Sequence, residues 1–322
     1  MKVLQLYNTT RSFLEGQIDA LESQGVECTR VSVPGQYEPG SPQSVSEYAR
    51  YYPKVLKETT GEYDLVHANY GLLTPFALAQ PTRPVVLTLW GTDLMSDRTW
   101  LSELSRFGAR HADAVVLPSR AMASELPYDH TVVPFGIDTE QFRPIPRREA
   151  RARVGWDPDG QYVLFPYSPE RPEKDFPRAR RIVDQLGADV ELKQIKDVPH
   201  DRMPYYLNAS DAVLITSTRE SGPMILKEAA ACNVPVVSTD VGFARRTLAD
   251  VHPSVVSDDD PELVSGLVDI LRGQTRSNGR EVLDGLGLDT MGERLAEVYR
   301  RALEKRGRSP HDSPSRNAPD LG

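Results

Sequence analysis

The sequence predicts an α/β protein made of two doubly wound parallel-sheet domains in series. Along most of the 322 residues, short runs of β-branched and other apolar residues alternate with segments able to form helices. The runs are apolar throughout instead of alternating with polar residues, which is typical of parallel strands covered on both faces. The alternation occurs twice, with a proline- and arginine-rich segment between the two series.

Composition narrows the class of protein. A net charge of −8 and a pI near 5.4 argue against a protein that works on nucleic acid. No window approaches the roughly 20 apolar residues of a membrane helix, and the N-terminus MKVLQLYN has too short an apolar run for a secretory signal. Cys28 and Cys232 lie far apart without a metal-like spacing. We therefore expect a cytoplasmic protein, with any membrane contact peripheral, at the inner face of the membrane.

The first series of strands begins at the N-terminus. The run VLQLY (residues 3–7) has strand length, and an amphipathic stretch from Ser12 to Ser23 follows it, with Gly25 placed to end that helix. Further β-branched runs repeat the rhythm. They are the segments 26–33, 63–68, 84–90, 114–119 and 131–135. We expect residues 1–145 to form one doubly wound domain.

An irregular segment separates the two series. FRPIPRREARARVGWDPDG, within residues 139–160, combines prolines and arginines, and a solvated connector is favoured over a phosphate-binding cluster. We place the domain boundary between residues 145 and 146.

The second series has the same rhythm and forms a predicted domain over residues 146–305. Its expected strands are 162–167, 190–195, 212–217, 234–239 and 254–257, and its expected helices include 178–187, 223–233 and 261–273. A charged helix from residue 292 ends it and is able to pack back on the first domain. Residues 306–322, rich in Ser, Pro and Asp, are predicted to be disordered. Two such domains imply a cleft between them, lined by loops at the carboxyl ends of the strands.

A candidate anion site lies where the strand 212–217 leads into the next helix. Pro223 suits the first helical position, because its missing N–H costs nothing there. The segment Gly222, Pro223, Met224 and Ile225 then presents backbone amides at the positive end of the helix dipole, and Gly222 lets a ligand approach closely. This arrangement suits a diphosphate.

Two glutamates of the stretch RESGPMILKE bracket this helix start. Glu228 lies about one and a half turns into the helix, and its carboxylate can accept hydrogen bonds from both hydroxyls of a ribose. Glu220, in the preceding loop, can do the same for a transferred sugar. The simpler alternative is that Glu220 is an ordinary helix N-terminal acid and Glu228 a solvated surface residue. The preceding strand, the Gly-Pro and the following small residues AAAC favour the sugar-nucleotide interpretation.

The combination resembles the E-x7-E signature of glycosyltransferase family 4, whose members are retaining enzymes of the GT-B fold. After Glu228, AACNVPVVSTDVG is similar to the family's next segment. Four segments of the first domain are similar to family motifs in the same order, namely YDLVHANYG, PVVLTLWGTDL, ADAVVLPSRAMASEL and VVPFGIDTEQFRP. The resemblance implies two Rossmann-like domains facing across a cleft, the first binding an acceptor and the second a nucleotide sugar.

The resemblance also implies site residues in the second domain. Arg171 and Lys174, in FPYSPERPEKDF, match an Arg and a Lys that neutralise the donor's diphosphate, with a solvated charged loop as the alternative. Charge that develops on a departing diphosphate must be compensated, and these cations would take the place of a metal ion. The backbone near Val198 is implied to face the nucleotide base. We expect a UDP-sugar donor, with a GDP-sugar as the alternative, and no essential divalent ion or other cofactor.

In the first domain the sequence departs from the family pattern. His67 and Asp93 match family positions at the cleft edge and are implied to be catalytic, although an isolated strand-end histidine is more often structural. Asn69 replaces a second histidine, and Trp90 stands where many relatives have a histidine that contacts the sugar. Trp90 is equally suited to stack on a sugar ring or to pack structurally.

The sequence therefore predicts a retaining glycosyltransferase of glycan or surface polysaccharide biosynthesis. The acceptor is a glycan, a lipid-linked glycan or a small molecule. A GT-B sugar-nucleotide epimerase and a phosphorylase are less favoured, because neither the acid/base groups of the first nor the cofactor lysine of the second is evident. A catalytically lapsed partner subunit is the third alternative, against which Arg171, Lys174, Glu220 and Glu228 weigh.

Overall fold

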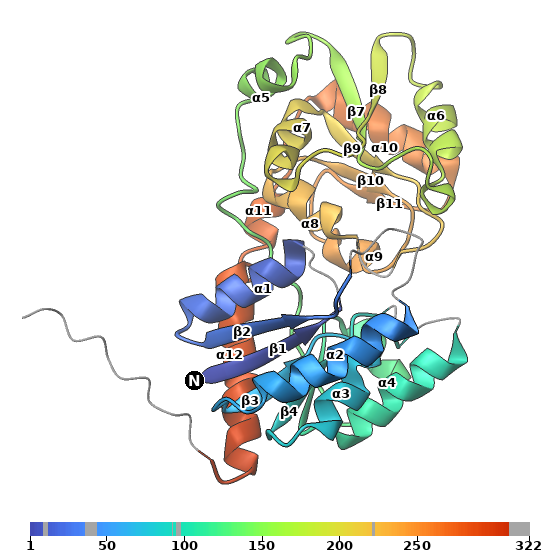
Figure 1. The fold of residues 1–322 in the computed structure, drawn as a ribbon. Coiled ribbons are helices and arrows are strands. Elements are labelled where there is room, and N and C mark those ends of the chain that lie inside the picture. The colour runs from blue at the N-terminus through green and yellow to red at the C-terminus, as the bar shows by residue number, and fades with distance from the viewer. Residues whose placement is uncertain (9–11, 36–43, 92, 95–97, 221–222, 309–322) are drawn as a thin grey trace, which may run out of the picture. The chain divides into compact units, whose positions relative to one another are not determined.

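A computed structural model describes residues 1–8, 12–35, 44–91, 93–94, 98–220 and 223–308 (Figure 1). The chain forms two compact units. The first contains Met1–Gly136 and the segment from Leu288 onward, and the second contains Ile137–Gly287. The division thus lies at Gly136 and Ile137, earlier than the predicted boundary at residues 145 and 146. The last helix, which was assigned to the second domain but predicted to be able to pack back on the first, belongs to the first unit.

The first unit is built on a six-stranded parallel sheet with the order β2-β1-β3-β4-β5-β6. The strands are β1 (Lys2–Tyr7), β2 (Glu27–Ser32), β3 (Leu65–Ala68), β4 (Val85–Thr88), β5 (Ala114–Leu117) and β6 (Thr131–Val132). The helices are α1 (Ser12–Ser23), α2 (Val45–Glu58), α3 (Thr74–Ala79), α4 (Thr99–His111) and α12 (Leu288–Lys305), with 3-10 turns η1 (Gly71–Leu73) and η2 (Arg120–Glu125).

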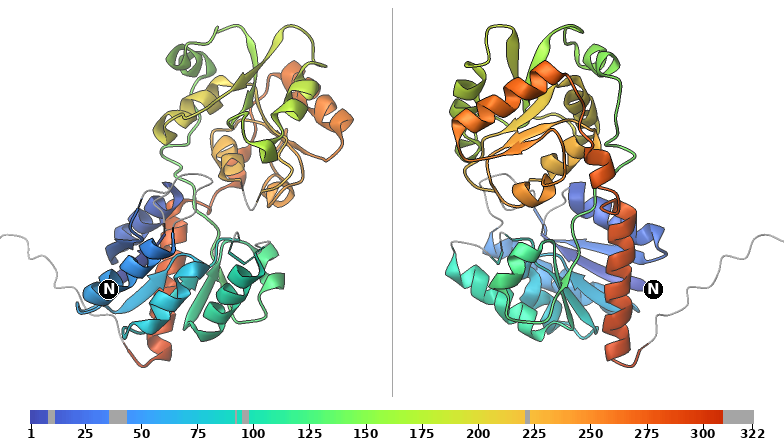
Figure 2. Two further views of the ribbon diagram at one scale, coloured as in Figure 1. Left: turned by 45° about the vertical axis from the view of Figure 1, so that its right-hand side comes forward. Right: turned by 180° about the vertical axis from the view of Figure 1, so that it is seen from behind.

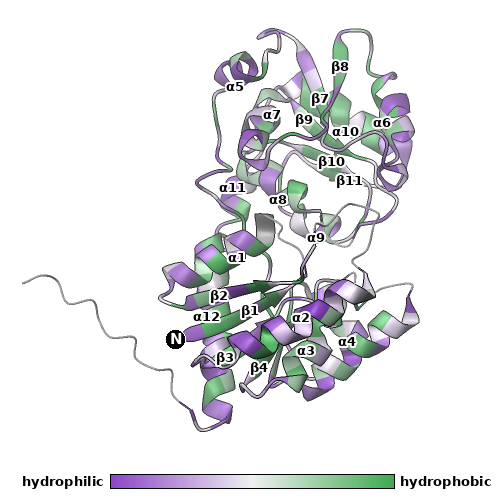
Figure 3. Cartoon of the chain, in the orientation of Figure 1, coloured by the Kyte–Doolittle hydropathy of each residue, from purple (hydrophilic) through white to green (hydrophobic). Residues whose placement is uncertain are grey.

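Successive strand residues of the first unit enter different cores. Val3 and Leu65 pack in the core that includes α1 and α12, whereas their neighbours Leu4 and Val66 pack in the core that includes α2 and α3. The inner strands β1, β3, β4 and β5 are therefore mostly apolar (Figure 3), as the sequence predicts for a doubly covered parallel sheet, whereas the edge strand β2 carries the exposed Glu27 and Arg30.

Helix α12 lies along one face of the first sheet, beside α1 (Figure 2). The two helices approach closely at Gly292, where an added Cβ would lie 2.4 Å from the carbonyl oxygen of Ala20. A residue larger than glycine would push α12 away from α1. The end of the chain thus completes the hydrophobic core of its beginning.

The second unit has a five-stranded parallel sheet with the order β11-β10-β9-β7-β8. The strands are β7 (Gln161–Phe165), β8 (Val190–Gln194), β9 (Ala212–Ile215), β10 (Val236–Ser238) and β11 (Val255–Val256). The helices are α5 (Arg147–Val154), α6 (Phe176–Val183), α7 (Met203–Ala209), α8 (Met224–Ala231), α9 (Ala244–Thr247), α10 (Asp260–Gly273) and α11 (Gly279–Val282), with 3-10 turns η3 (Pro172–Lys174) and η4 (His200–Arg202). Helices α6 and α10 contribute to one core and α7 and α8 to the other.

The prediction that the arginine-rich segment is a solvated connector is wrong for the residues that form α5. Arg151 is buried, and its guanidinium donates to the Asp211 carboxylate (2.8 Å) and to the carbonyl oxygens of Ala209 and Pro158. Arg147 also pairs with Asp211 (2.8 Å). These arginines attach α5 to the start of β9, so the segment is part of the second unit.

Residues 306–308, included in the predicted disordered tail, continue beyond α12 in contact with the first unit: Arg306 pairs with Asp113, and Arg308 donates to the carbonyl oxygen of Arg83. The rest of that tail lies outside the described residues. No helix in the described part of the chain has both the length and the apolar character that a bilayer crossing requires.

Candidate active site

The strand order of the second sheet reverses direction at β7, which marks the expected position of a ligand site. The chain passes from β7 outward to β8 and then returns to β9 on the other side of β7. In open α/β sheets, ligands bind outside the carboxyl ends of the strands where the order reverses in this way. The loops that follow β7 and β9 carry Lys174 and Glu220, so the predicted residues lie at the expected place.

Lys174 and Glu220 form a direct ion pair through Nζ and Oε1. The Lys174 side chain is only 3% exposed, and its ammonium group lies 4.0 Å from the centre of the Tyr167 ring. Burial lowers the pKa of Lys174, while the bond to Glu220 acts in the opposite direction. The cation is therefore held in a dry setting, where its charge acts strongly on a nearby anion.

Hydrogen bonds between the two loops fix this pair. Thr216 donates its hydroxyl to the carbonyl oxygen of Lys174 (2.9 Å), and the amide of Thr218 donates to the carbonyl oxygen of Glu173 (2.9 Å). Ser217 donates its hydroxyl to Glu220 Oε1 (3.2 Å). Cation and acid are thus oriented before any ligand arrives.

Arg171 is arranged differently from Lys174. Its side chain is half exposed and donates from Nε to Glu173 (2.8 Å), its neighbour along the same loop. Of the two cations predicted for the diphosphate, only Lys174 is paired with Glu220 in the structure.

Glu228 lies within α8, a helix whose residues from Ile225 to Ala231 are all buried. Its side chain is 10% exposed, which excludes the alternative of a solvated surface glutamate. Oε1 accepts a hydrogen bond from His200 Nε2 at 3.1 Å. His200 comes from η4, after β8, so loops that follow three strands contribute to the site.

The start of α8 is shifted by one residue from the prediction. Pro223 occupies the N-cap position and Met224 begins the helix, with no side-chain cap on its first amides. Met224 is half-buried and Ile225 buried. Gly222 lies outside the described residues. Val198, predicted to lie near the base, is partly buried and packs against the core that includes α7 and α8.

Two residues of the site were missed by the sequence reasoning. His200 contacts Glu228, and Tyr167 lies beneath Lys174. The Tyr167 hydroxyl is buried near Glu220, yet within the described residues it makes no hydrogen bond, and burial followed by the Glu220 charge raises its pKa. Each residue has a positional signal: Tyr167 lies two residues beyond the end of β7 at the reversal point, and His200 lies two residues beyond Val198.

The first unit corrects the expectation for His67. This side chain is fully buried in β3, with Nδ1 bonded to the Tyr299 hydroxyl (2.6 Å) and Nε2 to the Thr88 hydroxyl (2.7 Å). Burial lowers the pKa of His67 to about 3, so the imidazole is neutral. With both ring nitrogens engaged inside the core, the predicted catalytic role of His67 is not supported by its geometry, which is that of a structural residue.

Asp93 is also fully buried and organises its own loop. Oδ1 accepts the amides of Trp90 (2.8 Å) and Leu94 (3.0 Å), and Oδ2 accepts the amide of Gly71 (2.8 Å). Burial raises the pKa of Asp93 to about 6, and these backbone bonds oppose the shift. The predicted catalytic role of Asp93 is therefore not supported by its geometry.

The indole ring of Trp90 makes a hydrogen bond through its edge and a stacking contact through its face, both within the first unit. Its indole N–H donates to the carbonyl oxygen of Asn69 (2.8 Å), and its ring stacks on Phe135 with centroids 4.8 Å apart. These contacts favour the packing alternative for Trp90.

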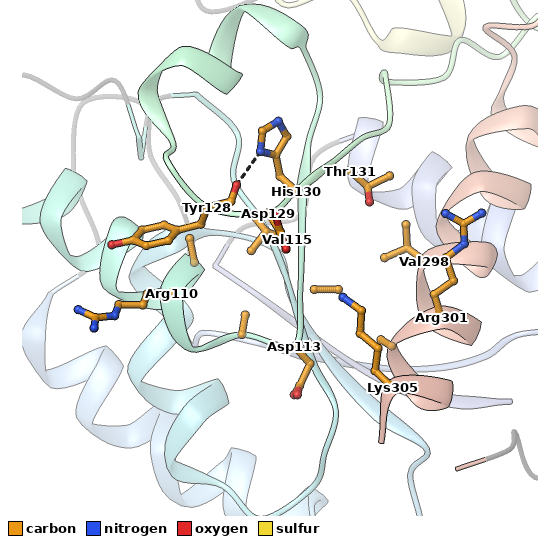
Figure 4. A pocket seen from close by; sticks show the side chains of 14 residues that line it. Arg110, Asp113, Val115, Tyr128, Asp129, His130, Thr131, Val298, Arg301 and Lys305 are labelled. Atoms are coloured by element: carbon orange, nitrogen blue, oxygen red, sulfur yellow. Dashed lines mark hydrogen bonds between the residues drawn. The ribbon is translucent and has the colours of Figure 1, made fainter. Parts of the chain in front are cut away.

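A cavity of about 550 Å³ lies elsewhere in the first unit (Figure 4). Its lining comes from the end of α4, the start of β5, the segment 128–131 and one face of α12, including Arg301 and Lys305. Asp113, in its wall, is already bonded to the amide of Val85 and to Arg306. This cavity lies at the amino ends of the strands, whereas ligands of such sheets bind at the carboxyl ends, so we do not assign the active site to it.

Comparisons with known proteins identify the family of both parts of the chain. The family model described as "Glycosyl transferase 4-like domain" matches residues 9–136, and the one described as "Glycosyl transferases group 1" matches residues 173–278. A relative from Catenulispora acidiphila, D-inositol 3-phosphate glycosyltransferase 1, is 27% identical over 82% of this chain and 80% of its own.

Two solved structures share the fold. Sucrose-phosphate synthase from Thermosynechococcus elongatus superposes with a TM-score of 0.73 at 15% identity, covering 95% of this chain and 100% of that one. The Anabaena protein HepE, in complex with UDP-glucose, superposes with a TM-score of 0.71 at 16% identity, covering 92% and 99%. The chain belongs to glycosyltransferase family 4 and has the GT-B fold.

Proposed function

We propose that the protein is a retaining glycosyltransferase that moves a sugar from a UDP-sugar to an acceptor hydroxyl in glycan or surface polysaccharide biosynthesis. A GDP-sugar is the alternative donor. The observation that carries this proposal is the buried Lys174–Glu220 pair at the reversal point of the second sheet. The HepE structure, which holds UDP-glucose, supports the choice of UDP.

Each polar group has a role in the donor site. Lys174 compensates the charge that develops on the departing diphosphate, with Arg171 and the amides of Met224 and Ile225 as further partners. Glu220 orients the hydroxyls of the transferred sugar, and Glu228 accepts the ribose hydroxyls. The backbone near Val198 faces the base. The Tyr167 hydroxyl, which has no hydrogen-bond partner among the described residues, is available to a ligand oxygen.

The transfer follows from these roles without an enzyme nucleophile. The bond between the anomeric carbon and the diphosphate oxygen breaks, and the acceptor oxygen forms a bond on the same face of the sugar. The acceptor proton passes to the leaving diphosphate. The first unit supplies the acceptor side, and a cytoplasmic site suits a nucleotide-sugar donor.

The first prediction concerns activity itself. Incubation with a panel of UDP-, GDP- and ADP-sugars, in a buffer containing EDTA, should release nucleoside diphosphate from one donor and give a product with the donor's anomeric configuration. The acceptor panel should include D-inositol 3-phosphate and simple glycans. Chelation should leave the rate unchanged, because Lys174 and Arg171 supply the positive charge that a metal ion otherwise provides.

The alternatives give different outcomes in the same assay. An epimerised sugar nucleotide without transfer would identify an epimerase. Inversion of the anomeric centre, detected by NMR, would contradict the retaining mechanism. No nucleotide binding and no turnover with any donor would favour a lapsed partner subunit.

We also propose that α4 provides a peripheral contact with an anionic membrane. Trp100 and Phe107 are 54% and 52% exposed, and they lie two turns apart on one face of this helix. Arg110, three residues beyond Phe107, is exposed as well. Exposed aromatic rings beside a basic residue suit the interface of an anionic bilayer.

The second prediction tests this surface. The protein should sediment with vesicles that contain phosphatidylglycerol more than with pure phosphatidylcholine, and the double variant Trp100→Ser/Phe107→Ser should lose this binding. Leu56→Ser, which removes the exposed Leu56 of α2, is the matched control and should retain it. Equal sedimentation of the double variant and the control would contradict the assignment.

A further inference from the structure

In the described part of the second unit, His200 is the side chain that hydrogen-bonds to the Glu228 carboxylate. Its Nε2 lies 3.1 Å from Oε1 of Glu228, whereas Oε2 accepts no side-chain hydrogen bond there. The Glu228 carboxylate sits on a buried helix and is itself almost buried. A carboxylate in this position needs a donor to fix its orientation and to stabilise its charge.

The imidazole is in turn held by the segment that begins the second unit. Its ring packs edge-on against the fully buried Phe142, with centroids 5.1 Å apart. Gln141 Nε2 donates to the backbone carbonyl oxygen of His200 at 2.9 Å and lies 3.4 Å from Nδ1. An amide N–H directed at Nδ1 favours the tautomer with its hydrogen on Nε2. The ring is therefore set to donate to Glu228 even when neutral.

Charges around the ring act in the same direction. The bond to Glu228 is the main cause of a raised pKa of His200, and the carboxylates of Asp138 and Asp201 add to it against the opposing effect of burial. Below this pKa the contact is a charge-assisted bond between imidazolium and carboxylate. As the pH rises through it, the proton is lost and the weaker neutral bond remains.

We propose that His200 is the positioning residue of the ribose site: it holds one oxygen of Glu228 so that the other faces the ribose hydroxyls. This inference rests on the proposed function, because it assigns His200 a part in binding the nucleoside diphosphate. His200 touches Glu228 and not the reacting atoms, so its effect should appear in nucleotide affinity and not in the chemical step.

The third prediction uses calorimetric binding of UDP, with GDP and ADP as further probes, and of their 2′,3′-dideoxy counterparts. For the nucleotide that binds the unaltered protein, His200→Ala should raise Kd about tenfold, the effect expected for losing one aligned bond to a charged group. The dideoxy counterpart should bind His200→Ala and the unaltered protein with equal affinity, because it lacks the ribose hydroxyls that donate hydrogen bonds to Glu228. His200→Gln, which places an amide N–H near the same point, should restore most of the affinity. Donor KM should rise in His200→Ala while kcat stays nearly constant.

Three results would overturn the inference while leaving the proposed function standing. They are an equal loss of affinity for the nucleotide and its dideoxy counterpart, tighter nucleotide binding by His200→Ala, or an affinity of His200→Ala equal to that of the unaltered protein. Arg202→Ala, on the same turn but without a bond to Glu228, is the matched control and should change Kd little. Failure of every nucleoside diphosphate to bind the unaltered protein would instead overturn the proposed function, and the inference with it.

Discussion

Replacing Lys174 with alanine should lower kcat about 10²–10³-fold, the loss typical of one preorganised electrostatic contact to a transition state. The reason is the position of this ammonium group at the reversal point of the second sheet, 3% exposed and fixed by the bond to Glu220. A buried charge needs no reorganisation when the diphosphate departs, so its loss acts on the chemical step more than on binding. Initial rates of sugar transfer at saturating donor measure the effect.

Controls separate this effect from a loss of folding. Lys174→Ala leaves the Glu220 carboxylate without its partner. The double variant Lys174→Ala/Glu220→Gln removes this uncompensated charge and should be assayed beside the single variant. Thermal unfolding of both variants shows whether they fold. Lys196→Ala is the matched lysine control, because Lys196 is exposed and pairs only with the exposed Glu170 among the described residues. Full activity of a folded Lys174→Ala protein would show that the diphosphate is compensated by other groups.

Replacing Glu228 with alanine should weaken binding of the donor and of the free nucleoside diphosphate about 10- to 100-fold. Each hydrogen bond to a charged group contributes about 1.5–3 kcal/mol, and about 1.4 kcal/mol corresponds to a factor of ten. Calorimetric Kd and donor KM measure the effect, and kcat at saturation should fall less than in Lys174→Ala.

Glu228→Gln tests the charge separately from the shape. The amide keeps one acceptor oxygen in the buried position and should bind more weakly than the carboxylate but more tightly than alanine. Glu281→Ala, on the exposed surface of α11, is the matched control. Unchanged nucleotide affinity in Glu228→Ala would assign the ribose to other residues.

The strands of both sheets could be predicted from the sequence because a buried strand is marked by a short local run of apolar residues. Apolar runs such as VLITS and PVVST report a strand covered on both faces, and the residues that follow them must lie at the carboxyl edge. The position of Glu220 after β9 follows from this rule, whereas Lys174 and the role of Glu228 were implied by the family resemblance. Burial of the whole of α8 does not follow from the rule, because it depends on packing against α7 and α11, which are distant in the sequence.

The expectation for the first unit was wrong where partners come from far along the chain. His67 follows a predicted strand pattern, but its role is decided by Tyr299, which is 232 residues later. Asp93 is satisfied by the backbone of its own loop and by Gly71, which a linear pattern does not reveal. His200 and Tyr167 escaped notice for the opposite reason: their chemistry becomes visible only when three strand-end loops are brought together.

The return of α12 to the first unit has a consequence for synthesis on the ribosome. The second unit is one uninterrupted stretch, Ile137–Gly287, whereas the first waits for the segment after Leu288. Until Tyr299 emerges, His67 Nδ1 and the Gln5 side-chain amide lack the tyrosine hydroxyl that they bond in the finished core. The half of the protein that is translated first is therefore the half whose folding is completed last.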